Sequence, residues 1–273
     1  MIQPERIQRI NRQLIREGRY VLYWMQAAQR ARCNHALEHA IDKANELGKP
    51  VVVAFGLTAD FPEANVRHFH FLLEGLRDTR RELRERGIQM IAWAKSPTAC
   101  VPDLAREACL VVVDAGHLRL QRQWRAEVGQ ALRCTLVEVE TNLIVPVEEA
   151  ADKENFSAGT FRPRIRRKLD AYLVGLKPRT VRKDSLGLKF DSLDLGDIDR
   201  LVRNLKVDAS VGKVNGFIGG ADEAVRRQGP GGDQRLGAGG EGQRPGVALD
   251  EAQRVGRREG RGAGGTGGLG LAE

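Results

Sequence analysis

The sequence has 273 residues, enough for one large domain or two ordinary ones, and its net charge of +8 is compatible with a polyanionic partner. It contains no apolar run near the roughly 20 residues that span a bilayer, no apolar leader after Met1 and no C-x-x-C pair among its four cysteines. These features argue against a membrane protein, a disulfide scaffold and a metal site. We expect a cytoplasmic protein with reduced thiols, and a monomer.

Strands and helices alternate after a polar leader at residues 1–19. Apolar, β-branched runs predict strands at 20–25, 51–55, 88–93, 110–114 and 135–139. Apolar residues at the 3.6-residue period predict helices at 30–47, 64–86, 101–107 and 119–131. Five such alternations predict an α/β domain over residues 20–150, with a doubly wound, five-stranded parallel sheet of Rossmann-like type.

The later part of the sequence changes in composition. Residues 151–216 predict a basic segment with a helix at 161–176, then a polar interdomain linker with a helix at about 196–206. Residues 229–273 contain more than half of the 31 glycines and no aromatic residue, so we predict disorder from about residue 225 onward. Two G-x-G-x-x-G matches, at 237–242 and 262–267, follow no predicted strand, so we expect no dinucleotide site there.

Ligands of doubly wound sheets bind beyond the carboxyl ends of the strands. In this sequence those positions are residues 24–30, 55–60, 94–96 and 114–118. The first of these turns has no G-x-G-x-x-G, which disfavours binding of a pyrophosphate. His117 is the histidine that this pattern places near a ligand, whereas Trp24, Trp93 and Trp124 are interpreted as core residues.

A set of short sequence blocks runs along the predicted domain. It comprises Tyr23-Trp24-Met25, Val53-Ala54-Phe55-Gly56-Leu57-Thr58, Phe71-Leu72-Leu73-Glu74-Gly75-Leu76 and Thr160-Phe161-Arg162-Pro163-Arg164. In order and spacing, the set resembles class II cyclobutane pyrimidine dimer DNA photolyases over about residues 20–170. Residues 217–225 resemble the start of that family's second domain, which is helical and holds FAD.

The resemblance implies light-dependent repair of cyclobutane pyrimidine dimers in damaged DNA, in which excited, reduced FAD passes an electron to the dimer. Residues 226–273 stand in place of the FAD domain, and we interpret their Gly- and Arg-rich composition as an out-of-frame tail, with genuine truncation as the alternative. We therefore expect the chain to retain only the antenna domain and to be inactive alone. A second hypothesis is a stand-alone chromophore- or nucleotide-binding α/β module without catalysis.

Photolyase N-terminal domains can hold an antenna chromophore, and the resemblance implies a deazaflavin here. Phe55, Gly56 and Leu57 would line its pocket, with Gly56 leaving room for a flat ring. Arg30 would meet a polar tail, and Asp114 would accept hydrogen bonds. In the alternative interpretation, Phe55 and Leu57 are core residues and Asp114 caps a turn.

Arg166, Arg167 and Lys168 belong to a basic cluster in the helix predicted at 161–176. Because Lys and Arg can neutralise backbone phosphates, these three residues are predicted to contact DNA. In the alternative, their charges pair with acidic groups on the family's helical domain.

Overall fold

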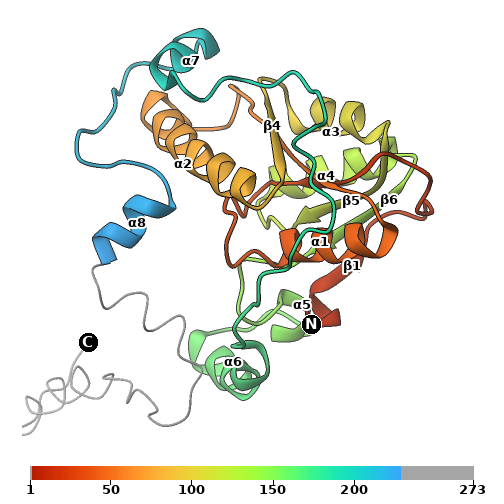
Figure 1. Cartoon of the computed structure of the whole chain (residues 1–273). Helices are drawn as coiled ribbons and strands as arrows, with labels where there is room; N and C mark the ends of the chain where they lie inside the picture. Colours follow the sequence, from red (N-terminus) through yellow and green to blue (C-terminus); the bar gives the residue numbers. More distant parts are fainter. Residues whose placement is uncertain (1, 229–273) are drawn as a thin grey trace, which may run out of the picture. The chain divides into compact units, whose positions relative to one another are not determined.

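The computed structural model describes residues 2–228, and six strands in that range form one sheet (Figure 1). They are β1 (Ile7–Arg9), β2 (Tyr20–Trp24), β3 (Val51–Gly56), β4 (Gln89–Trp93), β5 (Ala108–Asp114) and β6 (Thr135–Val139). The strand order is β1-β6-β5-β2-β3-β4, and all neighbours are parallel except β1 with β6. The predicted α/β fold with five parallel strands is therefore confirmed. The order of the parallel strands reverses between β2 and β5, where such sheets open a crevice.

Helices cover both faces of the sheet. α1 (His35–Leu47) and α2 (Val66–Glu85) pack on one face, and α3 (Pro97–Ala105) and α4 (Arg119–Ala131) pack on the other. Since successive side chains of a strand point to opposite faces, Tyr23 packs among residues of α1 and α2, and Trp24 packs among residues of α3 and α4. Both are fully buried, as expected for a parallel sheet between two helical layers.

The N-terminal segment adds an edge strand that the sequence analysis did not predict. A 3-10 helix, η1 (Pro4–Arg6), leads into β1, which pairs antiparallel with β6 and places Ile7 opposite Val139. The buried guanidinium of Arg6 donates a hydrogen bond to the carbonyl oxygen of Leu143 at 2.8 Å. Part of the predicted polar leader thus forms a sixth strand, which pairs antiparallel with the edge of the predicted five-stranded sheet.

The first helix begins later than its apolar period suggested. α1 starts at His35 rather than near residue 30, because the side chain of Asn34 accepts the backbone N–H of Leu37 at 3.0 Å and caps the helix. Its C-terminal end agrees with the prediction, since Gly48 adopts the left-handed conformation (φ 64°) directly after Leu47. The residues between β2 and α1 therefore form a loop rather than a helical turn.

Further helices follow β6 within the described range. They are α5 (Val147–Ala150), α6 (Ala158–Tyr172), α7 (Ile198–Leu205) and α8 (Ala221–Gln228). α6 overlaps the predicted basic helix, and α7 packs three buried side chains, Ile198, Leu201 and Val202, into the core layer that contains α2. The predicted tail and its two glycine motifs lie outside the described residues, apart from residues 226–228 at the end of α8. Among the described residues, no helix has the length and apolar character needed to cross a membrane.

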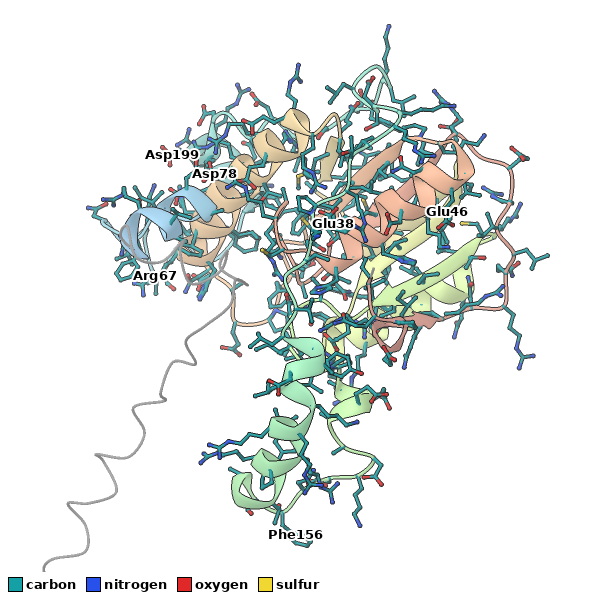
Figure 2. The ribbon with its side chains drawn as sticks, turned by 60° about the horizontal axis from the view of Figure 1, so that its bottom comes forward. Glu38, Glu46, Arg67, Asp78, Phe156 and Asp199 are labelled. Carbon is teal, nitrogen blue, oxygen red and sulfur yellow. The ribbon has the colours of Figure 1, made fainter. Side chains whose placement is uncertain are left out.

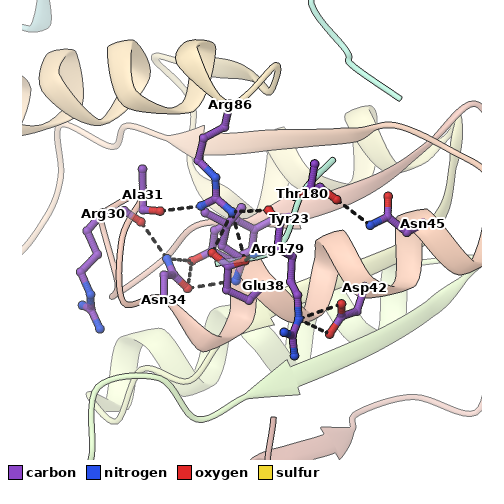
Figure 3. A network of polar contacts seen from close by, with 11 residues as sticks. Tyr23, Arg30, Ala31, Asn34, Glu38, Asp42, Asn45, Arg86, Arg179 and Thr180 are labelled. Atoms are coloured by element: carbon purple, nitrogen blue, oxygen red, sulfur yellow. Dashed lines mark hydrogen bonds and ion pairs between the residues drawn. The ribbon is translucent and has the colours of Figure 1, made fainter. Parts of the chain in front are cut away.

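A buried ion pair fixes the chain after α6 against the α/β domain (Figure 3). The carboxylate of Glu38 in α1 contacts the Arg86 guanidinium at 2.8 Å and accepts a hydrogen bond from the backbone N–H of Arg179. The guanidinium of Arg179 also pairs with Asp42 at 3.0 Å. Burial raises the pKa of Glu38 although both contacts act to lower it. The interdomain linker is therefore anchored to α1 where it passes Arg179.

Candidate functional site

The turn between β2 and α1 is closed by a carboxylate from β5. Asp114, the last residue of β5, accepts hydrogen bonds from the backbone N–H groups of Gln26 (2.8 Å), Ala27 and Ala28 (2.7 Å), and it is fully buried. In dinucleotide-binding folds, the amides of this turn meet a phosphate. Here an internal carboxylate already occupies them, so this turn does not offer a pyrophosphate site.

Tyr23 and Asn34 belong to the same hydrogen-bond network as Asp114. The Tyr23 hydroxyl donates to the Asp114 carboxylate at 2.9 Å and accepts from Nδ2 of Asn34 at 2.9 Å. Burial, followed by the charge of Asp114, raises the pKa of Tyr23 well above its ordinary value, so the hydroxyl remains a neutral donor. Because Asn34 also caps α1, the turn is tied to β2, β5 and α1 together.

A cavity of about 450 Å³ opens at the carboxyl ends of β2 and β3, and we call it the strand-end cavity. Its volume lies within the roughly 300–1,000 Å³ usual for small-molecule pockets. Phe61 and Trp124 form an aromatic wall, with ring centroids 6.3 Å apart and ring planes at 61°. Among the lining side chains Glu63 is acidic and none is Lys or Arg. The cavity therefore suits a flat, largely uncharged group.

Three of the five residues predicted to contact a chromophore line this cavity. Phe55 and Leu57 do so while remaining 6% and 3% exposed, so they also belong to the core. Gly56 lines it too, but a Cβ at this position would lie 3.0 Å from backbone atoms of Lys95 and Pro97. The glycine therefore makes room for the loop before α3, and its role beside a ring stays a prediction.

The other two predicted contacts are not among the residues that line the strand-end cavity. The guanidinium of Arg30 donates to the side chain of Asn142 at 2.7 Å and to the carbonyl oxygen of Cys33 at 3.2 Å. The Asp114 carboxylate accepts hydrogen bonds from the turn amides, which agrees with the alternative interpretation that Asp114 caps a turn. Sequence spacing placed both residues at strand ends without giving the direction of their side chains.

The sequence analysis did not single out several residues that line this cavity. Trp124 was interpreted as core, and it does pack partly against the second core layer, but it also faces the cavity from α4. Phe61 and His68 come from the loop before α2 and from its first turn. The spacing of Phe61 does not distinguish it, because Phe61 lies in a loop without periodicity.

The basic cluster lies on α6, where no side chain is buried. Arg166 and Arg167 are exposed, whereas the Lys168 ammonium pairs with Glu149 at 2.9 Å. Of the three residues predicted to contact DNA, two therefore present their charges to solvent and one is already partnered within the domain.

His117 is held by a neighbouring acid and does not line the strand-end cavity. Its Nε2 lies 2.8 Å from the carboxylate of Glu140, whose pKa is raised by burial although His117 acts to lower it. Within residues 2–228, no three His, Cys, Asp or Glu side chains are grouped closely enough to hold a metal ion.

Comparison with known proteins identifies the family. The family model for DNA photolyase matches residues 21–182, which is more than half of the chain. The chain belongs to the DNA photolyase family. The strand-end cavity and the hydrogen bonds from the β2–α1 turn to Asp114 are thus features of a photolyase α/β domain.

Curated relatives in the family match this part of the chain. Deoxyribodipyrimidine photo-lyase of Methanothermobacter thermautotrophicus is 51% identical over 190 residues, covering 69% of this chain and 43% of the relative. The protein of the same name from Arabidopsis thaliana is 31% identical over 216 residues, covering 75% of this chain and 42% of the relative. The chain thus spans less than half the length of these photolyases.

Solved structures of the family share the fold. An archaeal photolyase from Sulfolobus tokodaii, crystallised with two FAD molecules, superposes with a TM-score of 0.57 at 15% identity, covering 79% of this chain and 47% of its own. A class III photolyase from Agrobacterium tumefaciens gives a TM-score of 0.53 at 17% identity, covering 66% and 38%. At these identities the likeness supports the fold alone.

Proposed function

We propose that the described residues form the antenna domain of a class II photolyase that repairs cyclobutane pyrimidine dimers in light. The observation that carries this proposal is the strand-end cavity, because it lies at the crevice of the sheet in a chain of the photolyase family. The 51% identity to a deoxyribodipyrimidine photo-lyase supports the choice of reaction. Assignment to class II rests on the sequence blocks described above.

The proposed ligand of the strand-end cavity is an antenna chromophore of the deazaflavin type. When bound, such a chromophore would absorb light and pass the excitation to the catalytic flavin. The aromatic wall of Phe61 and Trp124 and the apolar side chains of Phe55 and Leu57 fit its flat ring. Arg30 and Asp114 are not part of this proposed site, since their polar groups are engaged elsewhere.

The catalytic FAD is proposed for a helical domain joined to this one. The strand-end cavity alone does not fit FAD, because no Lys or Arg lines it to hold a pyrophosphate. We therefore assign no contact with the catalytic FAD to residues 2–228. By the same argument, we propose that residues 2–228 repair no dimers by themselves.

The chromophore proposal is tested by adding a deazaflavin to the purified chain and recording absorption and fluorescence. Ala64 lines the cavity, so Ala64→Trp should fill it and abolish binding, whereas Ala126→Trp on the exposed side of α4 should leave binding unchanged. Binding that survives Ala64→Trp would place the chromophore elsewhere. Light-dependent loss of dimers from irradiated DNA with the chain alone would contradict the antenna assignment.

A stand-alone chromophore-binding module is the second candidate function. It is favoured by the way the cavity is enclosed by residues of the α/β domain itself, so that binding needs no other domain. The two candidates differ in outcome when the chain is joined to a flavin-binding helical domain. Light-dependent repair by the joined protein supports the antenna function, and chromophore binding without repair supports the module.

A further inference from the structure

A cavity at the amino ends of β5 and β6 lies at the opposite end of the sheet from the strand-end cavity. Its volume is about 580 Å³, and we call it the arginine cavity because Arg16, Arg106 and Arg133 line it. Figure 2 shows Glu46, in the last turn of α1, and Arg67, in the first turn of α2, on opposite sides of the domain. Since these helices run back along the sheet, the amino ends of the strands lie on the Glu46 side.

The lining of this cavity is cationic. Among the described residues that line it, three are arginines and none is acidic or aromatic. The remaining lining side chains are small or aliphatic, namely Pro102, Ala105, Ala131 and Leu132. The cavity therefore offers positive charge without a surface for stacking a ring, which is the reverse of the strand-end cavity.

The acidic residues close to the three arginines in sequence have cationic partners of their own. These pairs are Glu17 with Lys49 at 3.5 Å, Glu107 with Arg19 at 3.0 Å, and Asp103 with Lys95 at 3.6 Å. Asp103 also contacts Arg106 at 3.1 Å, but this pair is exposed and so contributes little. An excess of positive charge is therefore left at the cavity.

The guanidinium of Arg16 is held in place by backbone carbonyls. Its Nε donates to the carbonyl oxygen of Ala108 at 3.2 Å, and its Nη2 donates to that of Ala105 at 3.1 Å and to that of Arg106. Within residues 2–228, Nη1 of Arg16 makes no hydrogen bond and no ion pair. A donor that is already fixed loses little conformational freedom when it binds a ligand.

The segment between β1 and β2 builds this side of the cavity. Its backbone follows the starts of β5 and β6, since Arg16 N–H donates to the carbonyl oxygen of Cys109 and Thr135 N–H donates to that of Leu14, both at 3.2 Å. The Asn11 side chain donates to the carbonyl oxygen of Gly129 in α4 at 3.3 Å. Donors from this segment thus meet carbonyls at the ends of α3 and α4, which offsets the negative charge of two helix C-termini.

The other two arginines can reach a ligand from the opposite side. Arg106 and Arg133 are exposed, and within residues 2–228 the guanidinium of Arg133 makes no ion pair and no hydrogen bond. Guanidinium groups bind phosphate oxygens through paired N–H donors. Three of them around one cavity suit a ligand with more than one phosphate, and the volume is larger than a single phosphate needs.

We propose that the arginine cavity binds a diphosphate group, with phosphate oxygens on Nη1 of Arg16 and on the guanidinium groups of Arg106 and Arg133. This site is separate from the proposed chromophore site, and neither depends on the other. It gives a role to residues 10–19, which the sequence analysis assigned to a polar leader.

The test is titration of the purified chain with pyrophosphate, followed by calorimetry. Arg106→Gln and Arg133→Gln should each weaken binding about fivefold, the size of effect that one exposed ion pair provides, and the double variant about 25-fold. Arg122→Gln is the matched control, because Arg122 is an exposed arginine of α4 that does not line the cavity. Orthophosphate should bind about fivefold more weakly than pyrophosphate, because it reaches fewer of the arginines.

Hydrogen exchange gives a second readout that locates the ligand. Pyrophosphate should slow exchange over residues 10–19 and leave residues 58–65, beside the strand-end cavity, unchanged. ADP separates two sources of the diphosphate: binding as tight as that of pyrophosphate supports a diphosphate carried by a larger molecule, and weaker binding supports free pyrophosphate. Absence of pyrophosphate binding, or equal affinity in the wild-type chain and the double variant, would overturn this assignment.

Discussion

The carboxylate of Asp114, at the end of β5, accepts the hydroxyl hydrogen of Tyr23 from β2 at 2.9 Å. These two strands are neighbours at the point where the order of the parallel strands reverses. In a nucleotide-binding domain this point receives a phosphate, but here Asp114 holds the turn amides from inside the protein. Because these amides are occupied, the adjacent strand-end cavity is the part of the crevice that remains open to a ligand.

Replacing Asp114 should destabilise the whole domain. Asp114→Asn puts an amide NH₂ beside backbone N–H donors, so we expect the free energy of unfolding to fall by about 3 kcal/mol. Tyr23→Phe removes two hydrogen bonds, one to Asp114 and one from Asn34, and we expect a loss of about 2 kcal/mol. Urea unfolding followed by tryptophan fluorescence measures both. If Asp114→Asn were no more harmful than Tyr23→Phe, the carboxylate would not be what closes the turn.

His35 should make the protein less stable in acid. Burial lowers its pKa to about 4, with the charges of Arg6 and Arg30 acting in the same direction. The ordinary value near 6.5 applies in the unfolded chain, so between pH 6.5 and 4 the unfolded state binds the extra proton. Stability should therefore fall as the pH drops through this window, by at most about 1.4 kcal/mol per pH unit.

The control for this pH dependence is a pair of histidine variants. His35→Gln should flatten part of the slope, and His39, whose pKa burial also lowers, should account for a further part. Unfolding curves at several pH values measure the slope, and an unaltered slope in His35→Gln would contradict the assignment.

Adding one methyl group at Gly219 should release the segment before α8 from α2. A Cβ on Gly219 would overlap the carbonyl oxygen of Phe71 in α2, and the Gly219 N–H donates to the buried carboxylate of Glu74 at 2.8 Å. Burial alone would raise the pKa of Glu74, but Lys213 and this N–H outweigh it and lower the pKa. We therefore expect Gly219→Ala to detach the segment from α2.

Hydrogen exchange over residues 213–225 measures this release. Gly219→Ala should speed exchange there while the exchange of β2 and β5 stays slow. Gly212→Ala is the matched control, because a Cβ at that position meets no atom within 4 Å. Equal exchange in the two variants would show that the close approach to Phe71 does not hold the segment.

Much of the fold could be predicted because the buried strands have distinctive sequences. Val51–Gly56 and Ala108–Asp114 are buried along their whole length, and such strands appear as continuous apolar runs. Ile7–Arg9 could not be predicted in this way, because it is short and mostly exposed. Its pairing depends on β6, which lies about 130 residues later in the chain.

The candidate site was predictable only in part, for a geometric reason. Phe55 and Leu57 line the cavity because they lie at the end of the buried strand β3. Asp114 also ends a strand, and Arg30 lies in the loop after β2, but the polar group of Arg30 turns toward Asn142 and that of Asp114 toward the turn amides. Sequence spacing fixes where a residue leaves a strand, whereas the direction of its side chain depends on partners far along the chain.

The four cysteines should separate into one reactive thiol and three protected ones. Burial raises the pKa of Cys100 to about 12 and also raises the pKa values of Cys109 and Cys134. A thiol reagent should therefore modify Cys33 first in the native protein, and the other three after unfolding. Cys33→Ser should remove the fast phase, and its persistence in that variant would place a buried thiol within reach of solvent.

The exposed charges of α6 should contribute to binding of DNA. Arg166 and Arg167 are exposed and lie on a helix that buries no side chain. We expect charge reversal of both to weaken binding of duplex DNA and to lower the slope of log affinity against log salt by roughly 2, one unit for each phosphate that the helix no longer neutralises. Fluorescence anisotropy over a salt series measures this.

Reversal of Arg200 and Arg203 on α7 changes the net charge equally and should leave the slope unaltered. Equal effects of the two double reversals would mean that overall charge, and not binding by α6, attracts the DNA.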